Sequence, residues 1–239
     1  MLFSYQQQTQ FLLSDIKQEL INPAMLARYI NIARGQVAGE AECIKKIGTI
    51  STTVGTNVYN FSSINTGISA TTGIAGSINV STIQYNVASG QKWIAPRAWP
   101  WFQFYHLNNP VPVSGPPSVW SQYAQGVNGS FYVDPVPDLI YTFNCDCTCY
   151  PIDLVTDTTV EAIPYLWIDA VPYFAAYLAY VQAQKQDMAK SMFEQYTLFV
   201  QRARQFANPS VNKTAYAQAT DPVQLTKFGL VKAAKEGAA

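Results

Sequence analysis

Three cysteines at alternate positions are the most concentrated set of reactive side chains in this sequence. Cys145, Cys147 and Cys149 stand close together, and His106 is the only histidine of the chain. Three thiolates and one imidazole are a common ligand set for zinc. Alternate residues of a strand, however, stand about 6.5–7 Å apart, whereas thiolates that share a zinc ion lie about 4 Å apart. The spacing therefore favours small apolar core residues, and we expect no metal site.

The other groups that could catalyse a reaction are scattered. His106 would have to serve any Ser- or Cys-based triad, yet no nucleophile motif surrounds it. Asp134 and Asp138 could act as a general acid and base, but each stands beside a proline, where carboxylates commonly cap turns. The sequence contains no P-loop, no G-x-G-x-x-G and no H-E-x-x-H motif. We therefore expect neither an enzyme nor a cofactor.

Aromatic residues gather in the middle of the chain. Four of the tryptophans lie there, at positions Trp93, Trp99, Trp101 and Trp120. Exposed aromatic faces could stack on sugar rings, but aromatic residues are also typical of cores and of protein interfaces. We favour the core or interface interpretation. The candidate contacts between subunits are Trp120, Tyr123 and Tyr132.

Charged residues stand mainly towards the two ends of the sequence. Only Lys92, Arg97, Asp134 and Asp138 are charged between residues 51 and 144. Charged residues make up 13% of the chain and the net charge is zero, whereas soluble domains usually carry about 25%. A surface this poor in charge is explained if much of it lies against other subunits. The lack of a cation cluster argues against a protein that grips nucleic acid by its phosphates.

Neither secretion nor a membrane span is expected. The first residues lack the basic and apolar regions of a signal peptide, so we expect reduced thiols in a protein made in the cytoplasm. Residues 162–183 are apolar, but Pro164, Asp169 and Pro172 interrupt them. A buried and kinked helix fits this segment better than a transmembrane helix.

Helical periodicity dominates the N-terminal end. A short helix is expected within residues 4–13. A longer one should begin at Asn22 as N-cap and Pro23 as first residue, and should run to about Lys46, with Gly48 ending it. Its apolar face recurs at helical spacing, through Leu26, Ile30, Ala33, Val37, Ala41 and Ile44.

From residue 49 the pattern changes to that of strands. Residues 49–54 and 58–61 predict a hairpin, and further strands are expected at 78–87 and 101–107. The clearest alternation runs through 139–149, which places the three cysteines on one apolar face together with Tyr141 and Phe143.

Helices return after Pro151. One is expected from Ile163 to Gln184, kinked at Pro172. The next should be capped by Asp187 and end at Asn208. Its apolar residues follow nearly a coiled-coil seam, through Ala189, Met192, Tyr196, Phe199, Ala203 and Phe206. Together these patterns predict an α+β protein with helical ends and a β-rich middle.

Six stretches together resemble one known family. One of them is Gly115-Pro-Pro-Ser-Val-Trp, and another contains Asp134-Pro-Val-Pro-Asp. The full set is residues 26–38, 115–123, 129–141, 151–154, 163–180 and 187–206. Their order and spacing resemble tailed-phage head-to-tail adaptor proteins, of the head-completion or tail tubular protein A type. The resemblance covers roughly residues 20–66 and 115–207, and leaves the role of residues 66–109 open.

The resemblance implies a fold in which an antiparallel helical bundle carries an inserted β-sheet or β-sandwich-like domain. The expected divisions are N-terminal bundle helices (1–48), the β domain (49–155), C-terminal bundle helices (156–207) and an arm (208–239). In that family such an arm commonly docks on the portal. Here the docking candidates would be Leu225, Lys227, Phe228, Leu230, Val231 and Lys232.

The function that the resemblance implies is structural. We expect a virion protein of the phage neck that forms a ring of twelve copies, joins the portal to the tail and extends the channel used in DNA ejection. Its partners would be the portal and a tail, nozzle or fibre protein, and DNA would pass without sequence-specific binding. The alternative is a carbohydrate- or receptor-binding virion module that uses the aromatic β domain.

Overall fold

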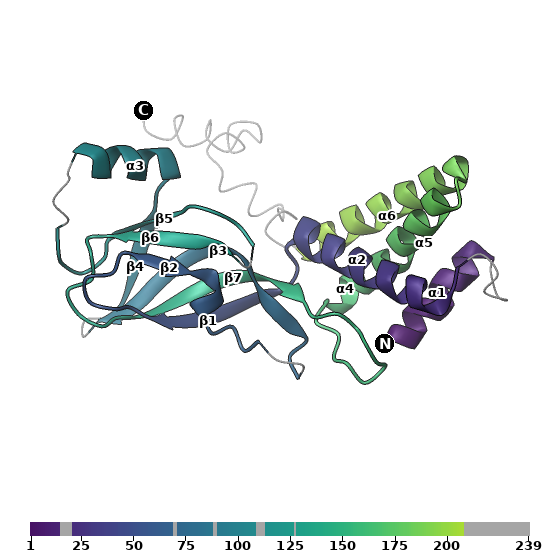
Figure 1. Cartoon of the computed structure of the whole chain (residues 1–239), viewed down its shortest axis with the longest axis horizontal. Helices are drawn as coiled ribbons and strands as arrows, with labels where there is room; N and C mark the ends of the chain where they lie inside the picture. The colour runs from purple at the N-terminus through teal and green to yellow at the C-terminus, as the bar shows by residue number, and fades with distance from the viewer. Residues whose placement is uncertain (15–20, 69–70, 88–89, 109–112, 127, 208–239) are drawn as a thin grey trace, which may run out of the picture.

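The chain folds into a helical part and a β part that lie side by side (Figure 1). The computed structural model describes residues 1–14, 21–68, 71–87, 90–108, 113–126 and 128–207. The helical part consists of α1 (Leu2–Leu13), α2 (Pro23–Ala41), α4 (Tyr165–Ile168), α5 (Ala170–Gln182) and α6 (Gln186–Ala207). These helices come from both ends of the described sequence. The mixed α+β fold predicted from the sequence is therefore confirmed.

The β part contains the strands and two short helical segments. Its strands are β1 (Lys45–Ser51), β2 (Val58–Asn60), β3 (Ile74–Val87), β4 (Gly90–Pro96), β5 (Val119–Gln122), β6 (Ser130–Asp134) and β7 (Thr142–Pro151). The 3-10 helix η1 (Phe61–Ser63) follows β2, and α3 (Trp99–Asn108) follows β4. The strands predicted at 78–87 and 139–149 are confirmed as β3 and β7.

The long N-terminal helix begins as the sequence predicts. Asn22 caps α2, because its side-chain oxygen accepts a hydrogen bond of 2.8 Å from the Met25 amide, and Pro23 is the first helical residue. The predicted end at Lys46 is wrong. Glu42 adopts a left-handed conformation with φ 48° and ends the helix after Ala41. The helix stops early because the residues from Lys45 onward pair with β7.

Gly48 does not end a helix, as the sequence predicted, but lies inside β1. A Cβ atom at this position would lie 2.5 Å from Cγ2 of Ile64 and 2.8 Å from Cγ2 of Thr66. These distances are shorter than any ordinary contact between carbon atoms. Gly48 therefore allows the segment around Ile64 to approach β1 closely.

Helix α5 lies at the centre of the helical part, where it packs against α1, α2 and α6. Ala175, Ala176 and Ala179 on α5 are fully buried, and their small side chains allow this close packing. The kink predicted at Pro172 is wrong. The chain breaks at Asp169, between α4 and α5, and Pro172 lies in the first turn of α5, where a missing backbone N–H costs no helical hydrogen bond.

The strands form one sheet in the order β1-β7-β3-β4-β5-β6-β2. The predicted hairpin of residues 49–54 and 58–61 is wrong. Strand β1 pairs with β7 along its whole length, and β2 pairs with β6. Pairing follows the burial of each strand's apolar face rather than closeness in sequence.

The sheet curls around an aromatic core. Tyr59 of β2 and Phe143 of β7 are far apart in the strand order, yet their ring centroids lie 6.2 Å apart. The three cysteines of β7 share the buried face of Phe143 and are completely buried. The prediction that they are core residues is confirmed. Within the described residues, no group of three or more His, Cys, Asp or Glu side chains could hold a metal ion.

Residues 101–107, predicted as a strand, belong to helix α3, which lies over β5 and β6 (Figure 1). The helical spacing brings Trp99 and Phe102 onto one side, where they contact the Tyr132 ring at centroid distances of 4.7 and 6.0 Å. A strand would place residues three apart on opposite faces. Among the described residues, no helix has the length and apolar character needed to cross a membrane.

Candidate functional site

The side chains considered for catalysis lie on separate elements or in the core. Asp134 is buried at the end of β6, whereas Asp138 is exposed and accepts a 2.7 Å hydrogen bond from the Tyr141 hydroxyl. Burial raises the pKa of the Cys149 thiol to about 11, and the nearby Cys147 adds to this effect. A thiol of that kind is a poor nucleophile at neutral pH. His106 lies within the bounds of α3, whereas the three cysteines belong to β7.

A buried ion pair joins the helical part to the β part. Arg34 of α2 binds Glu161 through two nitrogen–oxygen contacts of 2.9 and 2.8 Å, and it donates a 2.7 Å hydrogen bond to the Ile152 carbonyl. Asn31, one turn earlier, exchanges hydrogen bonds with the backbone of Leu154. Helix α2 thereby holds the segment that leads from β7 back to the helices.

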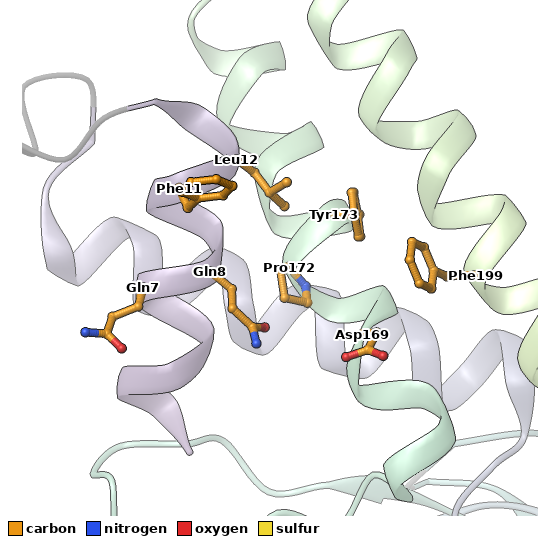
Figure 2. A pocket seen from close by; sticks show the side chains of 8 residues that line it. All are labelled: Gln7, Gln8, Phe11, Leu12, Asp169, Pro172, Tyr173 and Phe199. Atoms are coloured by element: carbon orange, nitrogen blue, oxygen red, sulfur yellow. The ribbon is translucent and has the colours of Figure 1, made fainter.

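An open groove of about 460 Å³ lies between α1, α5 and α6. Figure 2 shows its lining, which consists of Gln7, Gln8, Phe11, Leu12, Asp169, Pro172, Tyr173 and Phe199. Tyr173 and Phe199 stack with their ring centroids 4.9 Å apart, and Phe11 is 78% exposed. Asp169 is the only charged residue among the described residues that line it. The groove is thus an apolar surface with one carboxylate at its edge.

One residue of the predicted seam on α6, Phe199, lines this groove. Ala189, Tyr196 and Ala203 are buried inside the helical part. The other half of the seam consists of Met192 and Phe199, which are partly buried, and Phe206, which is 71% exposed. The periodicity in the sequence located the seam but could not show that its two halves would separate.

Two glycines of α2, Gly35 and Gly39, line an open cleft of about 510 Å³ together with Ile78, Gln125 and Tyr150 of the β part. A Cβ atom at Gly35 or Gly39 would meet no atom of the described residues within 4 Å, so packing within that part of the chain does not require glycine at either position. Each glycine in a helix interior costs about 1 kcal/mol relative to alanine. Exposed Ile32 lies one turn before Gly35. The face of α2 at Gly35 and Gly39 leaves room for a close contact from outside the chain.

The β part presents an aromatic surface around α3. Trp99 contacts the ring of Tyr123 at a centroid distance of 4.7 Å, and Tyr123 is 59% exposed. Trp101 is also exposed, and its ring has the Arg97 guanidinium at 5.0 Å and the Tyr105 ring stacked at 5.4 Å. These neighbours restrict the faces of Trp101 that a ligand could reach.

The structure separates the three candidate contacts between subunits. Tyr123 and Tyr132 lie together beside Trp99, with 6.3 Å between the two tyrosine ring centroids. Trp120 is buried and packs edge-on against Phe131. The candidates for portal docking, Leu225, Lys227, Phe228, Leu230, Val231 and Lys232, lie outside the described residues. The sequence did not reveal that Phe11 and Ile32 are exposed, because the type of a single apolar residue on a helix does not show whether its side chain is buried.

Two comparisons with known proteins bear on this architecture. Residues 6–223 match the family model described as SU10 adaptor protein. The match covers both the helical part and the β part. A search among curated proteins finds no match.

Proposed function

The chain belongs to the SU10 adaptor protein family of phage head–tail adaptors, and from this membership we propose that it is a ring subunit that joins the portal to the tail. As a member of that family it is a phage structural protein and a component of the virion. The family match over residues 6–223 is the observation that carries the proposal. In the proposed ring, about twelve copies extend the DNA channel below the portal.

We further propose that the helices form an antiparallel bundle and that the β part is an insertion between α2 and α4. The buried pair of Arg34 and Glu161 supports this division, because it fixes the return from the β part to the helices. A rigid connection suits a subunit whose two parts contact different neighbours. The zero net charge suits a channel through which DNA slides without binding.

The subunit surfaces support a closed ring. A ring requires two different surfaces on each copy that fit each other. The described residues offer the groove, the face of α2 at Gly35 and Gly39, and the aromatic surface of Tyr123 and Tyr132. We propose that the last two of these surfaces contact neighbouring copies.

The arm of residues 208–239 is proposed to dock on the portal. The test compares the full chain with a chain that ends at Pro209, both mixed with the portal protein of the same phage. We expect portal binding to be lost while the circular dichroism spectrum stays unchanged and thermal unfolding remains cooperative. The paired substitution Leu225→Asp and Phe228→Asp should reduce binding as strongly, whereas Lys213→Ala serves as the control. Undiminished binding by the shortened chain would refute this assignment.

A second candidate function is a carbohydrate- or receptor-binding module of the virion. Exposed Trp93 and Trp101 on the β part favour it, with 58% and 41% of their surfaces accessible. Saccharides that stack on these rings would quench tryptophan fluorescence. Quenching that Trp93→Ala abolishes would support this function, and an unchanged spectrum across a panel of glycans would count against it.

A further inference from the structure

The groove between α1, α5 and α6 has the chemistry of a binding site for an apolar segment with basic residues. Phe11, Tyr173 and Phe199 present aromatic surface to solvent at the groove (Figure 2). Asp169 has no ion-pair partner among the described residues. An occupant that supplied three or four apolar side chains and a lysine would cover the rings and neutralise the carboxylate.

The exposed half of the α6 seam leads from this groove to the end of the helix. Phe199 lines the groove, and Phe206 lies two turns further along α6. Helix α6 ends at Ala207. With a rise of about 1.5 Å per residue, the groove begins about 12 Å from the point where the C-terminal segment starts. The C-terminal segment of the same chain therefore starts close to the groove.

The composition of that segment fits the groove. Residues 225–232 read Leu-Thr-Lys-Phe-Gly-Leu-Val-Lys, with four large apolar residues, two lysines and no acidic residue. We propose that residues 225–232 bind in the groove of their own chain while the portal is absent. This inference rests on the proposed function, in which the same residues dock on the portal. The groove thus covers the docking segment until the portal competes for it.

The length of the intervening chain permits this contact. Residues 208–224 connect α6 to the segment, and a chain of that length can extend to about 55 Å. This reach exceeds the distance of about 12 Å from Ala207 to the groove. A short tether also gives effective concentrations in the millimolar range. A segment that binds the groove only weakly as a free peptide would therefore occupy it within its own chain.

Groove occupancy has a consequence for assembly. Occupancy of the groove lowers the apparent affinity of the portal for residues 225–232, because only segments that are not bound in the groove can dock. The portal would therefore have to bind the segment more tightly than the groove does. Variants in which residues 225–232 cannot bind in the groove should therefore bind the portal more tightly, provided that these residues are themselves unchanged. Asp169→Lys is such a variant, because Asp169 is exposed and its replacement repels Lys227 and Lys232.

Hydrogen exchange of the full-length protein tests the proposal. We expect the amides of residues 7–12 and 195–206 to exchange at least about threefold faster in the Leu225→Asp and Phe228→Asp double variant, and also in Asp169→Lys. Val211→Asp, which places a charge outside residues 225–232, is the matched control and should exchange like the parent. In the Asp169→Lys background, the substitutions Lys227→Glu and Lys232→Glu reverse the charge of the segment and should restore slow exchange.

The possible outcomes are distinct. Equal exchange in the parent and the double variant would overturn the proposal. Protection that disappears on dilution would assign the occupant to a second copy and would also overturn it. Portal binding is measured separately on the same proteins. Slow exchange without any portal binding would support the groove contact but count against the proposed adaptor function.

Discussion

Arg34 of α2 and Glu161, ten residues beyond the end of β7, form a two-point ion pair that is almost completely buried. The Arg34 side chain is 1% exposed and the Glu161 side chain 6%. The guanidinium also holds the Ile152 carbonyl at 2.7 Å, and Glu161 accepts a 2.9 Å hydrogen bond from the Ile163 amide. The pair therefore joins α2 to both ends of the segment that connects the sheet to the C-terminal helices.

Replacing Arg34 with Met should strongly destabilise the chain. The substitution leaves the Glu161 carboxylate buried without its partner, which typically costs about 3–5 kcal/mol. Urea unfolding followed by circular dichroism measures the loss. Arg202→Met is the matched control, because Arg202 is exposed on α6 and exposed ion pairs contribute about 0–1 kcal/mol. Similar losses in the two variants would contradict the role of the buried pair.

Substitution of the α2 glycines should raise the stability of the isolated chain but weaken its assembly. Gly35→Ala and Gly39→Ala should each stabilise the isolated chain by about 0.5–1 kcal/mol, because alanine favours the helix and the added methyl group meets no neighbour. If a neighbouring copy packs on this face, Gly39→Leu should weaken ring formation. Thermal unfolding measures the first effect, and sedimentation velocity measures the second. Normal assembly of Gly39→Leu would exclude this face from the ring contacts.

Gly48→Ala should destabilise the β part. The new methyl group would overlap the side chains of Ile64 and Thr66, and overpacking of this kind costs about 1–3 kcal/mol. Gly35→Ala, whose methyl group points into open space, is the matched control. An unfolding midpoint for Gly48→Ala at or above that of the parent protein would show that Ile64 and Thr66 move away without cost.

Alkaline pH should destabilise the fold. Burial raises the pKa of Cys43 and of Cys149 from 9.0 to about 11. The unfolded chain therefore loses these protons near pH 9 while the folded chain retains them, so stability is fully present below pH 9 and falls between pH 9 and 11. Each such proton contributes about 1.4 kcal/mol per pH unit in this range. Urea unfolding at pH 8, 9 and 10 measures the slope, which Cys43→Ala together with Cys149→Ala should reduce.

Local patterns in the sequence were sufficient for several elements. Asn22 and Pro23 located the start of α2, because capping depends on neighbouring residues alone. Alternation from Phe143 to Cys149 predicted a strand with one buried face, and β7 lies inside the sheet, between β1 and β3. The apolar residues from Ala189 to Phe206 recur at helical spacing, which is also a local pattern, and they predicted α6.

Long-range pairing could not be predicted in the same way. The segments 49–54 and 58–61 have the composition of a hairpin, but β1 pairs with β7, about a hundred residues away. Helix α3 has strand-like aromatic composition, and only its packing on Tyr132 shows that Trp99 and Phe102 must lie on the same side. The groove likewise depends on how α1, α5 and α6 meet. Within the site, therefore, the sequence predicted the helices but not the surface between them.

The molar mass of the complex with the portal tests the adaptor function most directly. The full chain is measured by light scattering after size exclusion, alone and after mixing with the portal ring of the same phage. We predict a complex whose added mass corresponds to about twelve copies per portal ring, even if the isolated chain elutes as a monomer. Separate elution of the chain and the portal at every mixing ratio would contradict the account.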